Sequence, residues 1–555
     1  MTTAESPDVL IAGAGPTGMI LAHELLRRGV RIRQVDRREG PSHTTRAFTL
    51  HARTMEMFEH LGVAPRLEQI SLPCPGNVFY FEGVPPEDRP RLDFRTLPSR
   101  FAFYYKLNQN DFEQVLRDHL LATYSHVPQY AAEVTDVRLA DDGAQVQIQH
   151  GETREAEELD VPWVVGCDGA HSRVRESAGI SFERAQVGVM AMMDVEITDF
   201  PYDDDWVNYF IGRDLFMLVT KLPGRLWRVY LSDPGEMTHD SDAQATFQKV
   251  SDRLGIGMRI GDPDWATRWT IPNGIAAEYR ADRVLICGDA SHVHSPAGGQ
   301  GMNGCMQDAF NLGWKLANVI DGRSPDRVLD TYGVERRPIG EQVTLGTKAT
   351  HDIVMAFGKN LDARVALTQT PEWHDAAVAL ISGLSHNYRD HVSMPDGLSP
   401  VDGPAAGERA PDAVLVAEPQ RRVFDLLRHP YFTLLLVPGK DPNEATTVTL
   451  LASAVTDAFA EQVRPVLIYR EDPLGFDIDH AVHDELGRMR AAYQIGPDDA
   501  GRIVLVRPDM YVALNAAMTD ANTVVPYLRT WLNAVAVTAT GEDQQPAMST
   551  KGRST

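Results

Sequence analysis

The chain is poor in cysteine, has fewer basic than acidic residues and lacks long apolar runs. Only 4 of its 555 residues are cysteines, without CxxC spacing, so we expect neither a disulfide scaffold nor a metal site, and the thiols fit a reducing cytoplasm. Its 53 Lys and Arg residues against 77 Asp and Glu residues give a net charge of −24. That balance disfavours nucleic acid and anionic membrane surfaces as partners.

No apolar stretch approaches the roughly 20 residues that a membrane span needs. Residues 432–437, one of the most apolar runs, have the length of a buried strand. The N-terminus has no basic region before its first apolar run at residues 9–11, whereas a signal peptide would have one. We therefore predict neither a membrane span nor a signal peptide.

A glycine-rich turn near the N-terminus lies between a predicted strand at 8–12 and a predicted helix at 16–28. Gly13 permits the tight turn, Gly15 lets the backbone approach a pyrophosphate, and Gly18 allows the helix to pack closely on the strand. Pro16 and Thr17 open the helix, where free N–H groups and the helix dipole favour a phosphate. The pattern predicts a dinucleotide site.

Asp36 strengthens this prediction because it ends the second predicted strand, at 31–36. A carboxylate there would accept hydrogen bonds from the adenosine ribose hydroxyls. Arg37 follows directly and is assigned to the same site. A glycine-rich turn without a ligand would not account for Asp36.

Two later stretches make FAD a better candidate than NAD. Asp168 and Gly169 follow a predicted strand at 161–166, and Gly288 and Asp289 follow another at 283–287, so both should reach the ligand-binding edge of the sheet. We expect Asp289 to bind a ribityl hydroxyl. The alternative, an acidic helix cap, would explain Asp289 but not the glycines that follow.

The loop after Asp289 leads into a predicted helix at 303–320. Its glycines leave backbone N–H groups bare at the positive end of the helix, where they could face the N1–C2=O region of a flavin. The loop residues assigned to the cofactor are Pro296, Gly299, Gly301, Met302 and Asn303.

Together, residues 13–18, Arg46-Ala47 ahead of 53–56, Gln109, 167–175 and 288–303 resemble the single-component FAD-dependent aromatic hydroxylases. Within the para-hydroxybenzoate hydroxylase family, the phenol and polyketide hydroxylase branch is most similar. The resemblance implies that Asp168-Gly169 helps to bind FAD and NADPH, that Arg46 contacts the pyrophosphate and that Gln109 approaches the flavin. The residues after Asn303 depart from the usual family pattern, which should alter the flavin pocket without abolishing binding.

The resemblance also implies the reaction. NADPH, or NADH, would reduce FAD, O2 would be captured as the flavin C4a-hydroperoxide, and one oxygen would be transferred to a ring carbon ortho or para to a hydroxyl. The substrate would be a small aromatic compound: a phenol, a hydroxypyridine or a polyketide-type precursor. No second GxGxxG motif follows the first, so NADPH would have no Rossmann domain of its own.

The predicted fold class is α/β, with a Rossmann-like FAD-binding domain and an inserted, mostly antiparallel substrate-domain sheet. Residues 405–540, and 505–513 most closely, resemble the thioredoxin-like C-terminal domain of the phenol and polyketide hydroxylase branch, which implies a C-terminal domain of that fold. The FAD-binding domain is assigned to residues 1–75, 101–181 and 276–350, the substrate-binding domain to 76–100 and 182–275, a helical linker region to 351–404, the thioredoxin-like domain to 405–540 and a disordered tail to 541–555. No cysteine follows Cys305, so the thioredoxin-like domain cannot perform disulfide chemistry.

Five residues are candidates for the reaction itself. Pro296 and Gly298 should lie by the reacting edge of the flavin through backbone atoms, and His292 could act as a base, as could its neighbour His294. Tyr209 belongs to an aromatic stripe on the inserted sheet. For the histidines a packed or loop-capping role, and for Tyr209 a place in the core, remain open.

Three other functions share parts of this pattern. A Baeyer–Villiger or epoxidising enzyme of the same fold remains an alternative, whereas a non-catalytic flavin-binding module would not need Asp168-Gly169. Trp265 and Trp269 resemble the WxWxIP motif of flavin-dependent halogenases, but they are four positions apart instead of two, which favours core packing. Formation of a homo-oligomer is left open.

Overall fold

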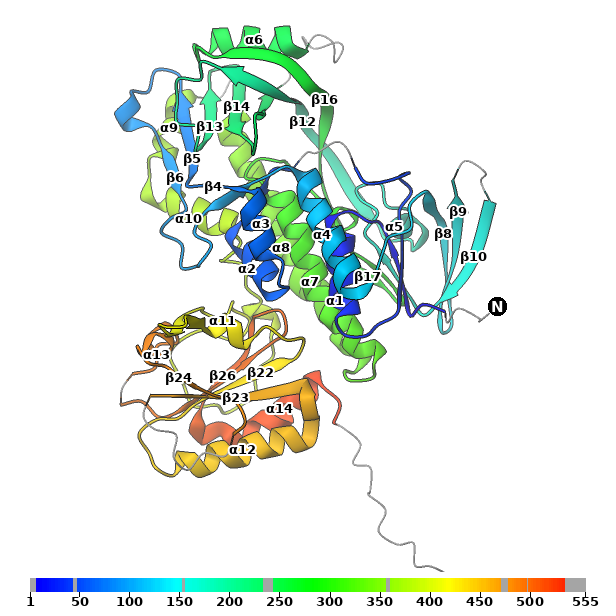
Figure 1. Cartoon of the computed structure of the whole chain (residues 1–555), viewed down its shortest axis with the longest axis vertical. Helices are drawn as coiled ribbons and strands as arrows, with labels where there is room; N and C mark the ends of the chain where they lie inside the picture. Colours follow the sequence, from blue (N-terminus) through cyan, green and yellow to red (C-terminus); the bar gives the residue numbers. More distant parts are fainter. Residues whose placement is uncertain are drawn as a thin grey trace, which may run out of the picture.

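The computed structural model describes residues 6–42, 47–151, 155–232, 243–355, 360–470, 478–496 and 498–534. Figure 1 shows an upper body of mixed helices and sheets, and below it a smaller domain formed by the yellow to red end of the chain. The tail predicted for 541–555 lies outside the described residues. Among the described residues, no helix is long and apolar enough to cross a membrane.

A five-stranded sheet with the order β17-β18-β11-β1-β2 is the centre of the upper body. The strands are β1 (Val9–Ala12), β2 (Ile32–Val35), β11 (Trp163–Gly166), β18 (Val284–Ile286) and β17 (Arg280–Ala281). All neighbours are parallel except the edge pair β17–β18. Strands β1, β11 and β18 are entirely buried and apolar, as is typical of a parallel sheet covered on both faces.

Helices follow the strands as a doubly wound fold requires. They are α1 (Pro16–Leu26), α2 (Ala52–His60), α3 (Ala64–Ile70), α4 (Gln109–Tyr124), α5 (Arg173–Ser177) and α7 (Gln300–Ile320). Helix α7 packs along α1 and begins three residues earlier than the predicted 303–320. Two small sheets complete the upper body: β3 (Thr49–Leu50), β7 (Tyr104–Lys106) and β4 (Leu72–Cys74), and β8 (Ala132–Ala140), β9 (Gly143–His150) and β10 (Glu155–Val161).

The inserted sheet has eight strands in the order β19-β16-β12-β15-β14-β13-β5-β6. They are β5 (Gly76–Phe81), β6 (Arg91–Asp93), β12 (Phe182–Thr198), β13 (Val207–Ile211), β14 (Phe216–Lys221), β15 (Trp227–Ser232), β16 (Arg259–Ala276) and β19 (His292–Val293). Only β13 and β5 pair in parallel among its described strands, so the prediction of a mostly antiparallel sheet is confirmed. Strand β19 joins this sheet to the loop after Asp289.

Helices cover both faces of the inserted sheet. Helix α6 (Ala243–Arg253) packs on one face, and α8 (Asp330–Met355), α9 (Leu361–Thr368) and α10 (Pro371–Ser382) contribute to the apolar cluster on the other. Ile353, Val378 and Ile381 are buried in that cluster. The segment predicted as a linker region, 351–404, therefore supplies part of the packing around the inserted sheet.

The C-terminal domain contains a five-stranded sheet in the order β24-β23-β22-β25-β26. Its elements are β20 (Val414–Val416), β21 (Arg421–Arg422), α11 (Val423–Leu426), β22 (Phe432–Val437), α12 (Glu444–Phe459), β23 (Val463–Tyr469), β24 (Ala481–His483), α13 (Arg488–Ala492), β25 (Arg502–Val506), β26 (Val512–Ala517) and α14 (Val524–Trp531). Helix α12 connects the parallel strands β22 and β23. The antiparallel strands β25 and β26 follow, and α14 ends the domain. This arrangement confirms the predicted thioredoxin-like fold, and Figure 1 shows α12 and α14 below the sheet.

Candidate active site

The carboxyl ends of four adjacent parallel strands bring the predicted motifs together. Strand β1 is followed directly by Gly13, β2 by Asp36, β11 by Cys167 and β18 by Cys287. A β-carbon added at Gly13 would lie 2.2 Å from the carbonyl oxygen of Cys167. One added at Gly288 would lie 2.7 Å from Oγ1 of Thr17. The three glycine-containing stretches therefore pack against one another, as the sequence predicted.

A cavity of about 250 Å³ opens at this edge of the sheet. Its lining combines the first two motifs with residues from β2, α4 and β8, namely Ala12, Gly13, Gly15, Pro16, Val35, Asp36, Arg37, Arg38, Gln109, Glu113, Ala132, Glu133, Val134, Cys167, Asp168, Gly169, His171 and Arg173. A β-carbon at Gly15 would meet no atom within 4 Å. The backbone at Gly15 is thus open, as an approaching pyrophosphate requires.

Asp36 is held in the cavity by its own neighbours. Its Oδ2 accepts a hydrogen bond from the backbone N–H of Ala14 at 2.7 Å, and the Arg38 guanidinium donates to both carboxylate oxygens at 3.0 Å. Burial alone would raise the pKa of Asp36, but the hydrogen bonds from Arg38 and Ala14 lower it below its ordinary value. The carboxylate is therefore ionised and oriented at the end of β2.

Asp168 also lines the cavity, and one of its carboxylate oxygens is hydrogen-bonded to the protein. Oδ2 accepts from the backbone N–H groups of Arg173 and Val174, at 2.7 and 3.2 Å. Oδ1 is buried and has no hydrogen-bond partner among the described residues. Burial raises the pKa of this carboxyl group above its ordinary value. The start of α5 is thus anchored to the Asp168-Gly169 motif.

Gln109 reaches the cavity from the first turn of α4. Its Oε1 accepts from the backbone N–H of Ala47 at 3.2 Å, and its Nε2 donates to Glu113 at 2.8 Å. Burial raises the pKa of Glu113. The predicted pyrophosphate contact, Arg46, lies outside the described residues, although its neighbour Ala47 is thereby placed beside Gln109.

The third motif adjoins this cavity without lining it. Asp289 is exposed and accepts a hydrogen bond from the Cys305 thiol at 3.3 Å. The carbonyl of Pro296 accepts from the N–H of Gly299 at 2.9 Å, which closes a turn just before α7. The other predicted loop residues, Gly298, Gly301 and Met302, stand in this turn and in the first turn of α7. Their contacts to FAD remain predictions.

Asn303 holds the loop through its side chain. Its Oδ1 accepts from the backbone N–H of His51 at 3.0 Å, and its Nδ2 donates to the carbonyls of Thr49 and Gly299 at 3.0 and 2.9 Å. The amide is thus fully engaged with the protein. Any approach of Asn303 to a cofactor would be through its backbone.

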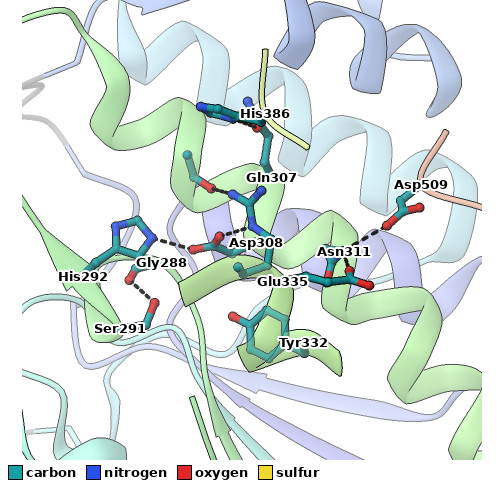
Figure 2. A network of polar contacts seen from close by, with 12 residues as sticks. Gly288, Ser291, His292, Gln307, Asp308, Asn311, Tyr332, Glu335, His386 and Asp509 are labelled. Carbon is teal, nitrogen blue, oxygen red and sulfur yellow. Dashed lines mark hydrogen bonds and ion pairs between the residues drawn. The ribbon is translucent and has the colours of Figure 1, made fainter. Parts of the chain in front are cut away.

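His292 lies in a buried polar network, shown in Figure 2. Its Nε2 is 2.7 Å from Oδ2 of Asp308, whose Oδ1 accepts from Nε of Arg336 at 2.6 Å. Burial alone would raise the pKa of Asp308, but Arg336 and His292 lower it. Nδ1 of His292 is buried without a hydrogen-bond partner among the described residues, so His292 is both a packed residue and a candidate base.

Tyr209 belongs to a buried aromatic cluster on the face of the inserted sheet that α10 covers. Its ring stacks on Phe79 at 4.9 Å between centroids and lies 6.0 Å from Phe216. Burial raises the pKa of Tyr209. Trp265 has a structural role, because its Nε1 donates to the buried carboxylate of Asp194 at 2.8 Å. This contact agrees with the core packing expected for the misspaced tryptophans.

The sequence interpretation missed several residues of the site. Arg38 and Glu113 line the cavity, and Asp308 partners His292. The spacing Asp36-x-Arg38 offered a signal for Arg38, since a side chain two positions after a strand-end carboxylate can fold back onto it. The spacing of Gln109 and Glu113, four residues apart on α4, offered a signal for Glu113. No local signal pointed to Asp308, because tertiary packing brings its partners His292 and Arg336 to it.

These observations define a dinucleotide-binding α/β protein whose cavity suits the adenosine and pyrophosphate parts of FAD. The open backbone at Gly15, the close approach at Gly13 and the oriented Asp36 all fit that ligand. The residues that would hold it are those of the cavity, with the turn before α7 left for the ring system.

Comparison with known proteins gives the family. The FAD binding domain model matches residues 6–347, and the aromatic-ring hydroxylase C-terminal model matches residues 403–534. Pentachlorophenol 4-monooxygenase of Sphingobium chlorophenolicum is 41% identical over 93% of this chain and 95% of its own, and 6-methylpretetramide 4-monooxygenase of Streptomyces rimosus is 30% identical over 95% and 94%. The OxyS anhydrotetracycline hydroxylase structure from Streptomyces rimosus superposes with a TM-score of 0.74 at 28% identity, covering 95% of this chain and 99% of that one.

The chain therefore belongs to the FAD-dependent aromatic-ring hydroxylases. It is a flavin-dependent aromatic monooxygenase that uses FAD, O2 and a nicotinamide reductant on an aromatic substrate. The sequence resemblance and the predicted cofactor are confirmed.

Acid should destabilise the protein through buried histidines. Burial lowers the pKa of His294 to about 4 and those of His51, His386 and His429 to about 3. The unfolded chain protonates near pH 6.5, so between pH 6.5 and 4 it binds more protons than the folded protein. The free energy of unfolding should therefore decrease as the pH is lowered through this window, by up to about 1.4 kcal/mol per pH unit for each histidine.

Urea denaturation at pH 7, 6 and 5 measures this dependence. His429→Gln removes one of these titrating groups and should make the loss shallower. A midpoint that stays constant from pH 7 to pH 5 would contradict the prediction.

Proposed function

We propose that this enzyme hydroxylates a phenol ortho or para to its hydroxyl group, with NADPH as the reductant. The observation that supports this most is the 41% identity to pentachlorophenol 4-monooxygenase across nearly the whole of both chains. The relative that acts on a tetracycline precursor, 6-methylpretetramide, is 30% identical. A small phenol is therefore favoured over a polycyclic polyketide.

The aromatic cluster around Tyr209 supports a ring-binding role for the inserted sheet. It includes Phe79, Phe216 and Tyr230, and also Ile381 at the end of α10. Nε2 of Gln300, beside the turn before α7, donates to the carbonyls of Leu380 and Ile381 at 2.7 Å. The loop assigned to the flavin and the aromatic cluster thus meet at the end of α10, where a ring could lie between them.

FAD, when bound, would supply the activated oxygen atom. The chain would orient the phenol, exclude water and accept the phenolic proton. We assign the last task to His292, because the Asp308 carboxylate at 2.7 Å from Nε2 can stabilise the protonated imidazole, and Nδ1 is left to accept a proton. His294 is the weaker candidate, since burial lowers its pKa to about 4.

Purified protein should be yellow, and its NADPH oxidation should accelerate with phenols to give products heavier by one oxygen. His292→Gln should slow turnover of phenols that are protonated at the assay pH, by about 10²-fold, and spare phenols already ionised. His294→Gln is the matched control. Stimulation by polycyclic aromatics alone would overturn the small-phenol assignment, and equal losses with both kinds of phenol would exclude His292 as the base.

The acidic charge and isolated thiols support a cytoplasmic location without a nucleic-acid partner. Homo-oligomer formation, a Baeyer–Villiger or epoxidising reaction, and the finer domain boundaries given above rest on the sequence. Sedimentation analysis and a ketone or alkene panel would test the oligomer and the alternative reactions.

A further inference from the structure

Helix α7, which begins at the loop assigned to the flavin, has an unusual row of buried polar side chains. Asp308, Asn311 and Lys315 are spaced by three and four residues and therefore share one face. Each is at most 1% exposed. Buried charges of this kind are stable only when they are paired and hydrogen-bonded, so the partners of this face determine where α7 can lie.

The first set of partners comes from α8. Arg336 donates to Asp308 at 2.6 Å. Its neighbour Glu335 accepts from Nζ of Lys315 and Nδ2 of Asn311, both at 2.8 Å. Two successive residues of α8 thus hold three positions of α7.

The second set comes from the C-terminal domain, from the turn between β25 and β26. Arg507 donates to both oxygens of Glu335 at 2.6 and 2.8 Å and to both oxygens of Asp509 at 3.0 and 2.6 Å. Asp509 also accepts from Asn311 at 3.0 Å. Figure 2 shows Asn311, Glu335 and Asp509 meeting at this point.

Arg507 is enclosed as well as paired. Its side chain is fully buried, and the guanidinium lies 5.2 to 6.0 Å from the ring centroids of four aromatic residues, Trp314, Tyr388, Tyr511 and Trp531. Two of these contacts lead back to the upper body, because Trp314 is on α7 and the hydroxyl of Tyr388 accepts from Nη1 of Arg336 at 3.2 Å. The anchored turn is therefore connected to Asp308 and His292.

We propose that the turn Arg507–Asp509 of the C-terminal domain is a positioning element of the FAD site. It holds α7 and α8 in register through Glu335 and Asn311. Through α7 it sets the place of the glycine-containing turn at 296–299 and, through Arg336 and Asp308, that of His292. The C-terminal domain then acts in the reaction without touching cofactor or substrate. The inference depends on FAD binding and not on the choice of a phenol.

The test uses full-length enzyme stripped of FAD and titrated with FAD. The double variant Glu335→Gln/Arg507→Gln removes the ion pair that joins α8 to the turn. It also takes the charged partners from Lys315 and Asp509, so FAD affinity is measured only on protein whose circular dichroism shows that it is folded. Neither residue lines the cofactor cavity. We expect the Kd for FAD to rise at least tenfold and the visible absorption band of bound FAD to shift.

A matched control is available in the same domain. Asp412 and Arg422 form an ion pair at 2.6 Å that belongs to the β20–β21 region and not to the turn at 507–509. Asp412→Asn/Arg422→Gln should lower the melting temperature of the protein while leaving FAD affinity and spectrum unchanged. Equal effects of the two double variants on FAD affinity, or no effect of either, would overturn the proposal.

If Glu335→Gln/Arg507→Gln does not fold, a milder variant still tests the proposal. Tyr388→Phe removes only the hydroxyl that accepts from Arg336 and keeps the ring that packs on Tyr511 at 4.3 Å. It should weaken FAD binding by two- to fivefold and shift the flavin spectrum in the same direction. Unchanged affinity and spectrum in Tyr388→Phe would show that the network only docks the domain. Because FAD binding is the readout, a wild type that binds FAD but ignores phenols would overturn only the proposed function.

Discussion

Gly15→Ala should weaken FAD binding sharply and leave the fold intact, whereas Gly13→Ala should damage both. The two glycines stand two residues apart in one motif, but their surroundings differ. A β-carbon at Gly15 would meet no atom within 4 Å, whereas one at Gly13 would lie 2.2 Å from the carbonyl oxygen of Cys167. Gly13 also has a φ of 112°, where a side chain is strained.

These contacts determine how much stability and FAD affinity each substitution should cost. Overpacking and backbone strain at Gly13 should reduce the free energy of unfolding by about 3 kcal/mol. At Gly15 the added methyl group enters the cavity and would meet only the ligand. Overpacking against the pyrophosphate at about 1–3 kcal/mol corresponds to a loss of FAD affinity of about 10- to 100-fold.

Fluorescence titration with FAD and urea denaturation of the FAD-free protein separate the two effects. Gly29→Ala is a useful reference, because Gly29 follows α1, has a φ of 81° and meets no atom within 4 Å. It should cost stability through strain without affecting the cavity. An affinity for FAD in Gly15→Ala equal to that of the wild type would show that the first motif does not belong to the cofactor site.

The strands and turns that hold the motifs were predictable from local sequence. Each of β1, β11 and β18 is a short apolar run, as is typical of buried parallel strands, and a glycine follows each of them within three residues. Adjacent parallel strands end at one edge of the sheet, so the convergence of Gly13, Asp168 and Gly288 followed from the strand assignment alone.

The polar partners within the site were not predictable in the same way. Arg507 lies 172 residues from Glu335, and no periodicity relates the two. Such pairs depend on the angle at which helices and domains pack. The segment 351–404 illustrates the same limit: its helical pattern was recognised, but the burial of Val378 and Ile381 against the inserted sheet depends on tertiary contacts.

Asp194→Leu should strongly destabilise the inserted sheet, because it would leave the guanidinium of Arg228 buried without its carboxylate partner. Asp194 accepts from Nε and Nη2 of Arg228 at 2.8 and 2.7 Å and from Nε1 of Trp265 at 2.8 Å. The Arg228 side chain is 0% exposed. Breaking a buried ion pair by removing one partner costs about 3–5 kcal/mol, which urea denaturation of the variant would measure.

The double variant Asp194→Leu/Arg228→Met distinguishes charge from packing. With both charges replaced by apolar groups, no ion is left uncompensated, so most of the lost stability should return. Weaker FAD binding should persist in the double variant. Nη1 of Arg228 also donates to the carbonyl of Ala47 at 3.1 Å, and the N–H of Ala47 donates to Gln109 in the cofactor cavity. Weaker FAD binding in a stable double variant would therefore show that Arg228 connects the inserted sheet to the cofactor site. A double variant as unstable as Asp194→Leu would instead mean that shape, and not charge, makes this pair essential.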